Sequence, residues 1–248
     1  MKKIFSYIGI TTLALMSFMI TSKTTAVIKE TDEIMIKINE EKQKYEKEPI
    51  DAKIEENKII PGQYGKKINI EKTYDQMKKL GKYNPKYYVY EQIKPKLSIE
   101  DTYDKYIESA NPKKNEISII LNLNKKVELK EIEKLIKNQN IEVIILKDNK
   151  PMIENNYFTQ DNNYCYIEEE NESKLKECAK QNKHTIKKHD IKNNLLKNTK
   201  QTISNGKIIS IEINNMTIKE LELTINYIKN KGYKIVKIQE LISEKNTN

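Results

Sequence analysis

The chain has 248 residues, which is enough for one or two domains with a buried core. Lysine and arginine total 45 against 36 acidic residues, giving a net charge of +9. The basic residues alternate with glutamate without forming a compact run, and no RNA- or DNA-binding signature accompanies them. A nucleic-acid partner is therefore not expected. The same charge is compatible with an anionic wall polymer or an acidic membrane surface.

The N-terminus predicts a membrane segment. Residues 4–21, IFSYIGITTLALMSFMIT, carry no charge and follow Lys2 and Lys3. This apolar stretch is close to the length that crosses a bilayer. We expect an uncleaved anchor with the N-terminus in the cytosol, because positive residues stay on the cytosolic side. Cleavage near Thr24 and Ala26 would instead release a secreted protein. In both cases the rest of the chain is expected to be extracytoplasmic.

The part of the chain before residue 110 predicts a tether and a small lobe. Residues 27–58 mix glutamate and lysine, as in a solvated juxtamembrane helix or an extended tether. The turn-rich IIPGQYG follows, then a helix pattern over 69–81 capped by Asn69, and an edge strand that stops before Pro95. The predicted parts are a signal or anchor segment, a tether, an accessory lobe and an α/β domain: 1–26, 27–58, 59–110 and 111–248.

From Ile117 onward, strand and helix patterns alternate. β-Branched runs at 117–121, 141–146 and 206–213 are separated by amphipathic stretches with helical periodicity. The last long helix is expected to open with a capping box formed by Thr217 and Glu220. This alternation predicts a mostly parallel sheet or barrel.

Two stretches carry a family resemblance. IKNKGYKIVKIQELIS, residues 228–243, resembles the C-terminal end of polysaccharide deacetylases of the NodB-homology type. ISIILNLNKK, residues 117–126, then takes the place of the first strand and catalytic motif of that family. The likeness covers residues 110–245. It implies a shortened, irregular (β/α) barrel of the polysaccharide-deacetylase type, preceded by a small N-terminal lobe and a transmembrane helix.

The resemblance also implies where the chemistry would lie. The family removes N-acetyl groups with a divalent metal such as zinc, held by one aspartate and two histidines, with a second aspartate as base and a late histidine as acid. Here the base position falls on Asn122, the ligand aspartate on Leu123 and the acid on Glu212. The expected HxxxH pair is absent, and the two histidines, His184 and His189, have the wrong spacing to replace it. The sequence therefore resembles a degenerate member without the metal ligands, and no cofactor is expected.

Two functions remain open. The first is a membrane-anchored, catalytically inactive protein that binds or scaffolds cell-wall glycan or an anionic wall polymer. Sugar-stacking rings would come from tyrosines in the central region: Tyr157, Tyr164 and Tyr166. The alternative is an active metal-dependent glycan N-deacetylase with a rearranged carboxylate site, which would combine Glu212 with Asp148, Asp161 or Glu168. The missing histidine pair favours the first function.

The two cysteines, Cys165 and Cys178, leave two roles open. An extracytoplasmic location permits a disulfide between them. A helix over this region would alternatively bury Cys178 beside Leu175 as a small apolar side chain. Neither cysteine has the spacing of a zinc motif.

Overall fold

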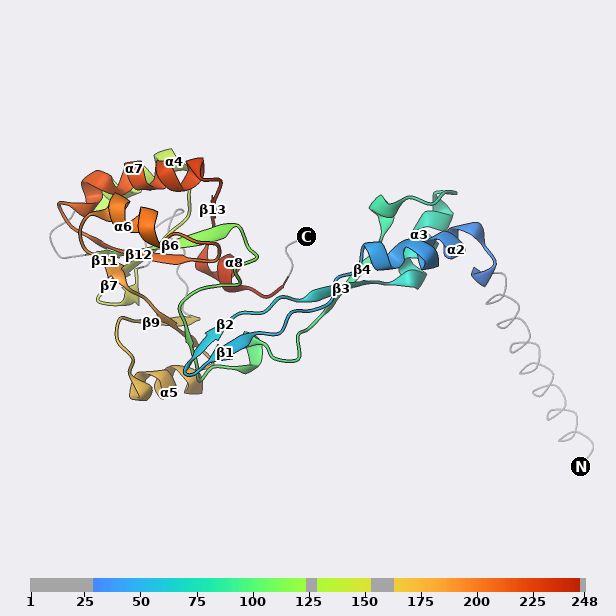
Figure 1. Cartoon of the computed structure of the whole chain (residues 1–248), viewed down its shortest axis with the longest axis horizontal. Helices are drawn as coiled ribbons and strands as arrows, with labels where there is room; N and C mark the ends of the chain where they lie inside the picture. The colour runs from blue at the N-terminus through green and yellow to red at the C-terminus, as the bar shows by residue number, and fades with distance from the viewer. Residues whose placement is uncertain (1–28, 124–128, 153–162, 246–248) are drawn as a thin grey trace, which may run out of the picture. The chain divides into compact units, whose positions relative to one another are not determined.

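The computed structural model describes residues 29–123, 129–152 and 163–245. The chain divides into two compact units, Met1–Glu48 with Gly65–Ile93 and Pro49–Tyr64 with Lys94–Asn248 (Figure 1). These boundaries differ from the predicted ones, because both 49–64 and 94–110 belong to the second unit.

The predicted membrane segment, residues 4–21, lies outside the described residues. Among the residues that the structure does describe, no helix is long and apolar enough to cross a membrane.

The first unit is a small helical lobe with a two-stranded antiparallel sheet. Helix α2 begins after Asp32, whose side chain accepts the Ile34 N–H at 2.9 Å, and α3 begins after the predicted cap Asn69, which accepts the Lys72 N–H at 2.9 Å. Part of the predicted tether is therefore a packed helix, with Ile38 fully buried. The elements of this unit are α2 (Glu33–Glu41), η1 (Lys42–Lys44), β3 (Gly65–Ile68), α3 (Ile70–Lys79), η2 (Pro85–Tyr87) and β4 (Tyr90–Ile93).

The second unit has two sheets. One has the strand order β1-β2-β5-β10-β9; the other has the order β11-β12-β6-β7-β8, with β13 also paired to β6. Their strands are β1 (Lys53–Glu55), β2 (Lys58–Ile60), β5 (Tyr106–Ile107), β6 (Glu116–Leu123), β7 (Ile144–Lys147), β8 (Lys150–Pro151), β9 (Tyr164–Ile167), β10 (His184–Lys187), β11 (Asp190–Ile191), β12 (Ile208–Ile213) and β13 (Lys234–Ile235). The helices are η3 (Ile99–Asp101), α4 (Leu129–Gln139), α5 (Glu172–Lys180), α6 (Leu195–Thr202), α7 (Thr217–Asn230) and α8 (Ile238–Ile242).

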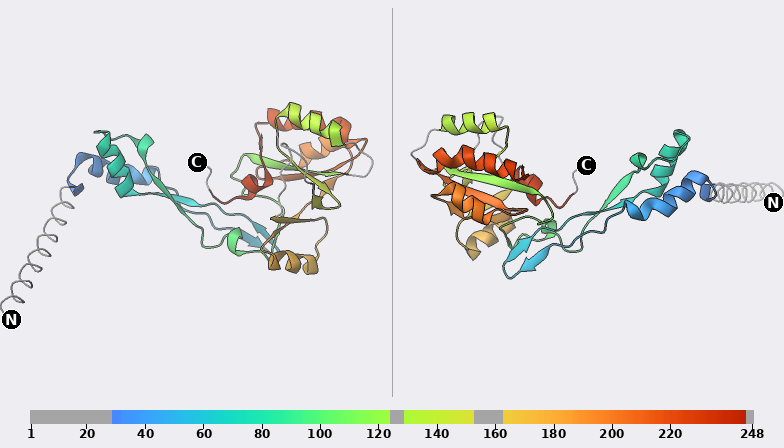
Figure 2. Two further views of the ribbon diagram at one scale, coloured as in Figure 1. Left: turned by 180° about the vertical axis from the view of Figure 1, so that it is seen from behind. Right: turned by 45° about the horizontal axis from the view of Figure 1, so that its top comes forward.

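The central strand β6 is buried on both faces, as its continuous apolar run predicts. Leu121 and its odd-numbered neighbours pack against α4, α6 and α7, which cover one face of the sheet (Figure 1, Figure 2). Ile120 points to the other face, where it shares a core with Ile107 and Ile186 of the five-stranded sheet. The sheet containing β6 therefore lies between a helical layer and a second sheet.

The mixed α/β class is confirmed, but the strands described here form two separate sheets instead of one closed barrel. β10 and β11 follow each other in sequence and belong to different sheets. The chain crosses from one sheet to the other at Lys188 and His189. This crossing brings polar residues close to the ends of β6 and β12.

The predicted capping box at the start of α7 is wrong. Thr217 lies inside the helix, and its hydroxyl donates to the Glu212 carbonyl oxygen at 2.6 Å. The Glu220 carboxylate accepts the Leu196 N–H of α6 at 2.9 Å. The side chain of Asn214 accepts the Thr217 N–H instead, at 3.1 Å. The Thr-x-x-Glu spacing takes account of α7 alone, so it cannot show that Glu220 binds the start of the neighbouring helix α6.

Glu244 ties the C-terminal end of the second unit to two earlier segments. Its side chain is buried; one carboxylate oxygen accepts the Gly62 N–H at 2.6 Å. The other oxygen accepts the Ser98 hydroxyl and, at 3.2 Å, the Ile99 N–H. These contacts join residues that are far apart in sequence.

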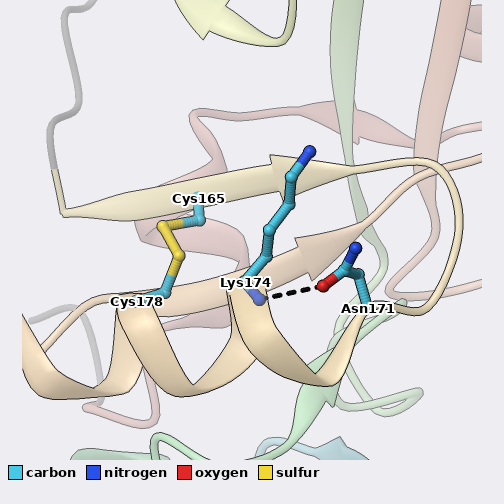
Figure 3. The surroundings of a disulfide bond; sticks show 4 residues. All are labelled: Cys165, Asn171, Lys174 and Cys178. Carbon is cyan, nitrogen blue, oxygen red and sulfur yellow. Dashed lines mark hydrogen bonds between the residues drawn. A yellow bond between two sulfur atoms is a disulfide. The ribbon is translucent and has the colours of Figure 1, made fainter.

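Cys165 and Cys178 form a disulfide that links β9 to α5 (Figure 3). Their Cα atoms are 6.3 Å apart and the two residues are separated by 13 positions. Helix α5 begins after Asn171, whose side chain accepts the Lys174 N–H at 3.0 Å. Of the two roles left open by the sequence, the structure contains the bridge, and Cys178 is also buried beside Leu175. The helix is therefore fixed to the sheet covalently as well as by packing.

Candidate functional site

Asn122 and Glu212, which take the places of the family's base and acid, lie near the carboxyl ends of two neighbouring parallel strands. In the register of β6 and β12, Asn122 lies opposite Glu212, and in that of β11 and β12, Asp190 lies opposite Ser210. Side chains that share a register in parallel strands point to the same face of the sheet. Asn122, Ser210 and Glu212 therefore lie on the face that looks toward the second sheet.

Asp190 is the centre of this cluster. Its side chain is only 1% exposed and accepts three hydrogen bonds: from the Lys188 ammonium at 2.8 Å, the Asn122 amide at 2.8 Å and the Ser210 hydroxyl at 2.5 Å. Burial raises the pKa of the Asp190 carboxyl, but the hydrogen bonds from Lys188, Ser210 and Asn122 outweigh it and hold the pKa below its usual value. The group is an anion whose oxygens are already engaged, so it is poorly placed to act as a base.

Lys188 supplies the positive charge of the cluster. Its side chain is fully buried, and its ammonium lies 2.8 Å from the Asp190 carboxylate and 3.1 Å from that of Glu168. A buried ammonium is stable only when anions and hydrogen bonds compensate its lost hydration. The crossing from β10 to β11 places it where both carboxylates can do so.

These residues do not fit the divalent metal that the resemblance implies. The Asn122 amide donates its hydrogen to Asp190, and the Leu123 side chain packs against the apolar core. The Lys188 ammonium already contacts the carboxylate that a metal ion would need, and a second cation there would be repelled. Within the described ranges, no group of three or more His, Cys, Asp or Glu side chains is arranged to hold a metal ion.

A cavity of about 330 Å³ lies beside the cluster. Its lining combines Glu168, which contacts Lys188, with two amides, two further carboxylates, one aliphatic side chain and one ammonium: Asn149, Asn171, Glu169, Glu170, Ile167 and Lys174. Amide and carboxylate oxygens accept hydrogen bonds from hydroxyl and N–H donors. The cavity is therefore suited to a small polar ligand.

The described carboxylates of the alternative site have separate surroundings. Glu212 is partly exposed, and its carboxylate lies 3.9 Å from the Lys192 ammonium. Asp148 is exposed in the turn between β7 and β8, and Asp161 lies outside the described residues. Glu168 is engaged by Lys188. Among the described residues, neither Asp148 nor Glu168 joins Glu212 in a group that could hold a metal ion.

The two histidines have separate surroundings. His184 stacks on Tyr103 with ring centroids 4.4 Å apart, and burial lowers the pKa of its imidazole. His189 is exposed, with its Nε2 atom 3.7 Å from the Glu108 carboxylate. The hydrogen bonds described for the Asp190 carboxylate come from Lys188, Asn122 and Ser210, not from either imidazole.

The three tyrosines proposed for sugar stacking have different positions. Tyr157 lies outside the described residues. Tyr166 is 4% exposed and packs in the core between the sheets, so the idea that its ring stacks on a sugar is wrong. Tyr164 is half-buried and lies near the His184 ring, with centroids 6.3 Å apart. Burial increases along this short strand, from the half-buried Tyr164 and Cys165 to the buried Tyr166 and Ile167, and the sequence YCYI does not reveal this gradient.

Sequence reasoning missed the two charged residues at the centre of the cluster. Neither Asp190 nor Lys188 stands out in the sequence as a site residue. The segment HTIKKHDIK gives one weak signal, because Lys188 and Asp190 lie two positions apart between Ile186 and Ile191. Their burial depends on the crossing between sheets, which local periodicity does not reveal.

Comparison with known proteins adds two sequence matches. Residues 23–82 match a family described as "Putative peptidoglycan binding domain". A curated relative, "Uncharacterized protein YlxY" of Bacillus subtilis (strain 168), is 34% identical over 101 residues. That match covers 40% of this chain and 32% of the relative, so it spans about a third of the relative's length.

Solved structures give a more extensive match. Wild-type BA3943, described as a CE4 family pseudoenzyme from Bacillus anthracis, matches with a TM-score of 0.56 at 19% identity, covering 88% of this chain and 97% of that one. A BA3943 mutant described as having restored enzymatic activity matches with a TM-score of 0.61 at 19% identity, covering 87% and 100%. The fold is that of BA3943, and the match to it extends over most of the chain. The resemblance to deacetylases is thereby confirmed at the level of the fold.

Proposed function

We propose that this protein is a catalytically inactive, deacetylase-like protein that binds cell-wall glycan. The observation that carries the proposal is the cluster around Asp190. At the edge of the CE4 fold where the family resemblance places a metal and a base, a buried ammonium, an amide and a hydroxyl saturate one carboxylate. This arrangement leaves no activated nucleophile, but it leaves the neighbouring cavity open to a polar ligand.

Two further findings support glycan as the ligand. The cavity beside Glu168 offers amide and carboxylate acceptors, which match the hydroxyl and acetamido groups of a wall sugar. The match of residues 23–82 to a peptidoglycan-binding family points to the same class of polymer. The basic net charge makes an anionic wall polymer a second ligand to test.

An acetate-release assay combined with sedimentation tests this function. The purified full chain, with and without added zinc, is expected to release no acetate from peptidoglycan or chitooligosaccharide and to sediment with insoluble peptidoglycan. Glu169→Lys is expected to weaken sedimentation, because it places a cation at an exposed position of the cavity lining and removes an acceptor without touching the Lys188 ion pairs. Glu222→Lys is the matched control, since it makes the same charge change on an exposed position of α7.

Two results would count against the proposal. Zinc-dependent acetate release that disappears in Glu212→Ala would establish the active-hydrolase alternative. Failure of the unchanged protein to bind both peptidoglycan and teichoic acid would leave no support for a wall ligand.

We further propose that residues 4–21 anchor the protein in the membrane, with the remaining chain outside the cell. The motivation is the charge-free N-terminal stretch after Lys2 and Lys3. Protease added to intact protoplasts is expected to degrade the chain while it remains in the membrane fraction. Full protection from protease would exclude this orientation, and recovery in the culture medium would indicate cleavage.

A further inference from the structure

A second cavity lies in the second unit, between helix α5 and the segment that leads into β5. Its volume is about 740 Å³, within the usual range for binding pockets of roughly 300–1,000 Å³. None of Asp190, Lys188, Asn122 and Glu212 lines it. We call it the α5 groove and define it by Asn57, Tyr106, Glu170, Leu175, Ala179 and Lys180, with further charged residues at its rim.

The floor of the α5 groove is apolar and rigidly supported. Leu175 and Tyr106 are buried against each other in a small core, and Ala179 adds a further small apolar surface. The Tyr106 hydroxyl accepts the Asn171 N–H at 2.9 Å, at the start of α5. The disulfide from Cys178 to β9 holds the same helix in place (Figure 3). The groove is thus a formed feature of the fold.

The rim carries acidic and basic residues, of which one pair forms a salt bridge in the described structure and three others do not. Glu172 pairs with Lys176 at 3.3 Å along the helix. Asp104, Lys105 and Lys180 also line the groove, and none of the three forms an ion pair with another residue in the part of the chain that the structure describes. A ligand that carries both an ammonium and carboxylates would complement these groups.

These features distinguish a peptide from a sugar. Tyr106 is the ring that lines the groove, and its side chain is 1% exposed, so it offers no face on which a sugar could stack. The methyl group of an alanine in a peptide ligand would fit the floor formed by Leu175 and Ala179. The terminal ammonium and carboxylate of the same peptide would fit the acidic and basic residues of the rim. We infer that the α5 groove binds a short zwitterionic peptide that contains alanine together with charged residues, of the class that is attached to wall glycan. The choice of a wall peptide rests on the proposed function.

Calorimetric titration of the full chain with the tripeptide L-Ala-γ-D-Glu-L-Lys tests the groove. Binding is expected, and each of the charge reversals Asp104→Lys and Lys180→Glu should raise the dissociation constant about tenfold, because each replaces a charge-assisted contact by repulsion. Both positions are exposed, so their substitution should leave the fold intact. Glu222→Lys and Lys219→Glu make the same charge changes on exposed positions of α7, outside the groove, and should leave the dissociation constant unchanged.

Ala179→Phe provides a steric test, because the added ring would occupy the groove from a partly exposed position. Loss of tripeptide binding with an unchanged unfolding temperature would support the proposal. Equal weakening by the groove and α7 substitutions would overturn it, since binding would then depend on net charge alone. Absence of tripeptide binding would also overturn it: if peptidoglycan still sediments the protein, the glycan proposal stands, and if it does not, both proposals fail.

Discussion

Replacement of Lys188 by methionine is expected to lower the free energy of unfolding by about 3–5 kcal/mol. Methionine preserves most of the apolar stem but removes the ammonium. Asp190, whose side chain is 1% exposed, would then remain buried with two neutral donors, Asn122 and Ser210. Breaking one partner of a buried ion pair is more costly than removing both, because the remaining charge loses its compensation. Urea denaturation followed by circular dichroism measures the change.

Two variants control this result. Lys192→Met removes a lysine that is 59% exposed and 3.9 Å from Glu212, and is expected to cost less than about 1 kcal/mol. The double variant Lys188→Met/Asp190→Asn is expected to be more stable than Lys188→Met alone, because it removes the stranded charge. If Lys188→Met were no more destabilising than Lys192→Met, the buried pair would not be an important part of the fold.

The same carboxylate gives stability a pH dependence. Since the folded-state pKa of Asp190 lies below the unfolded value of about 3.8, its contribution is present above that pH and is lost as the pH falls through the folded-state pKa. Asp190→Asn is expected to flatten the acid limb of a plot of unfolding free energy against pH. An unchanged acid limb would mean that other carboxylates determine it.

Replacement of Glu244 by alanine is expected to cost about 3–5 kcal/mol, comparable to the loss of Lys188. The buried carboxylate accepts hydrogen bonds from Gly62, Ser98 and Ile99, and alanine would leave all three donors buried without that partner. Each stranded donor costs about 1–3 kcal/mol. Thermal and urea unfolding of the full chain would measure the loss.

Glu244→Gln is expected to cost less than Glu244→Ala, because the amide keeps one oxygen acceptor but turns an NH₂ group toward a donor. Glu240→Ala, at an exposed position of the same C-terminal region, serves as the matched control and should change stability little. Equal stabilities of Glu244→Ala and Glu240→Ala would contradict the role assigned to the buried carboxylate.

Local patterns predicted the central elements of the second unit well. The apolar run at Ile117 corresponds to the buried strand β6, and the last long helix expected from the sequence corresponds to α7. Asn69 was correctly predicted as a helix cap. In each case the prediction depends on the periodicity of a few neighbouring residues or on one local side-chain hydrogen bond. Such features can be recognised without knowledge of the whole fold.

The unit boundaries and the polar cluster depend on contacts between distant segments. Residues 49–64 join the second unit because β2 pairs with β5 and because Gly62 binds Glu244. Lys188 is buried because the chain changes sheets next to it. A residue between two sheets can look like an ordinary surface lysine in sequence, since no local pattern records which strands become neighbours. The family resemblance located Asn122 and Leu123 but gave no account of what replaced the lost ligands.

The crossing at Lys188 sets a barrier to the engineering of a metal site beside Asp190. A divalent ion could approach the Asp190 carboxylate only after the lysine had been replaced, and this is the substitution that we expect the folded state to tolerate poorly. Introduction of metal ligands would therefore have to begin with variants that are less stable, so compensating substitutions elsewhere in the core would be needed first.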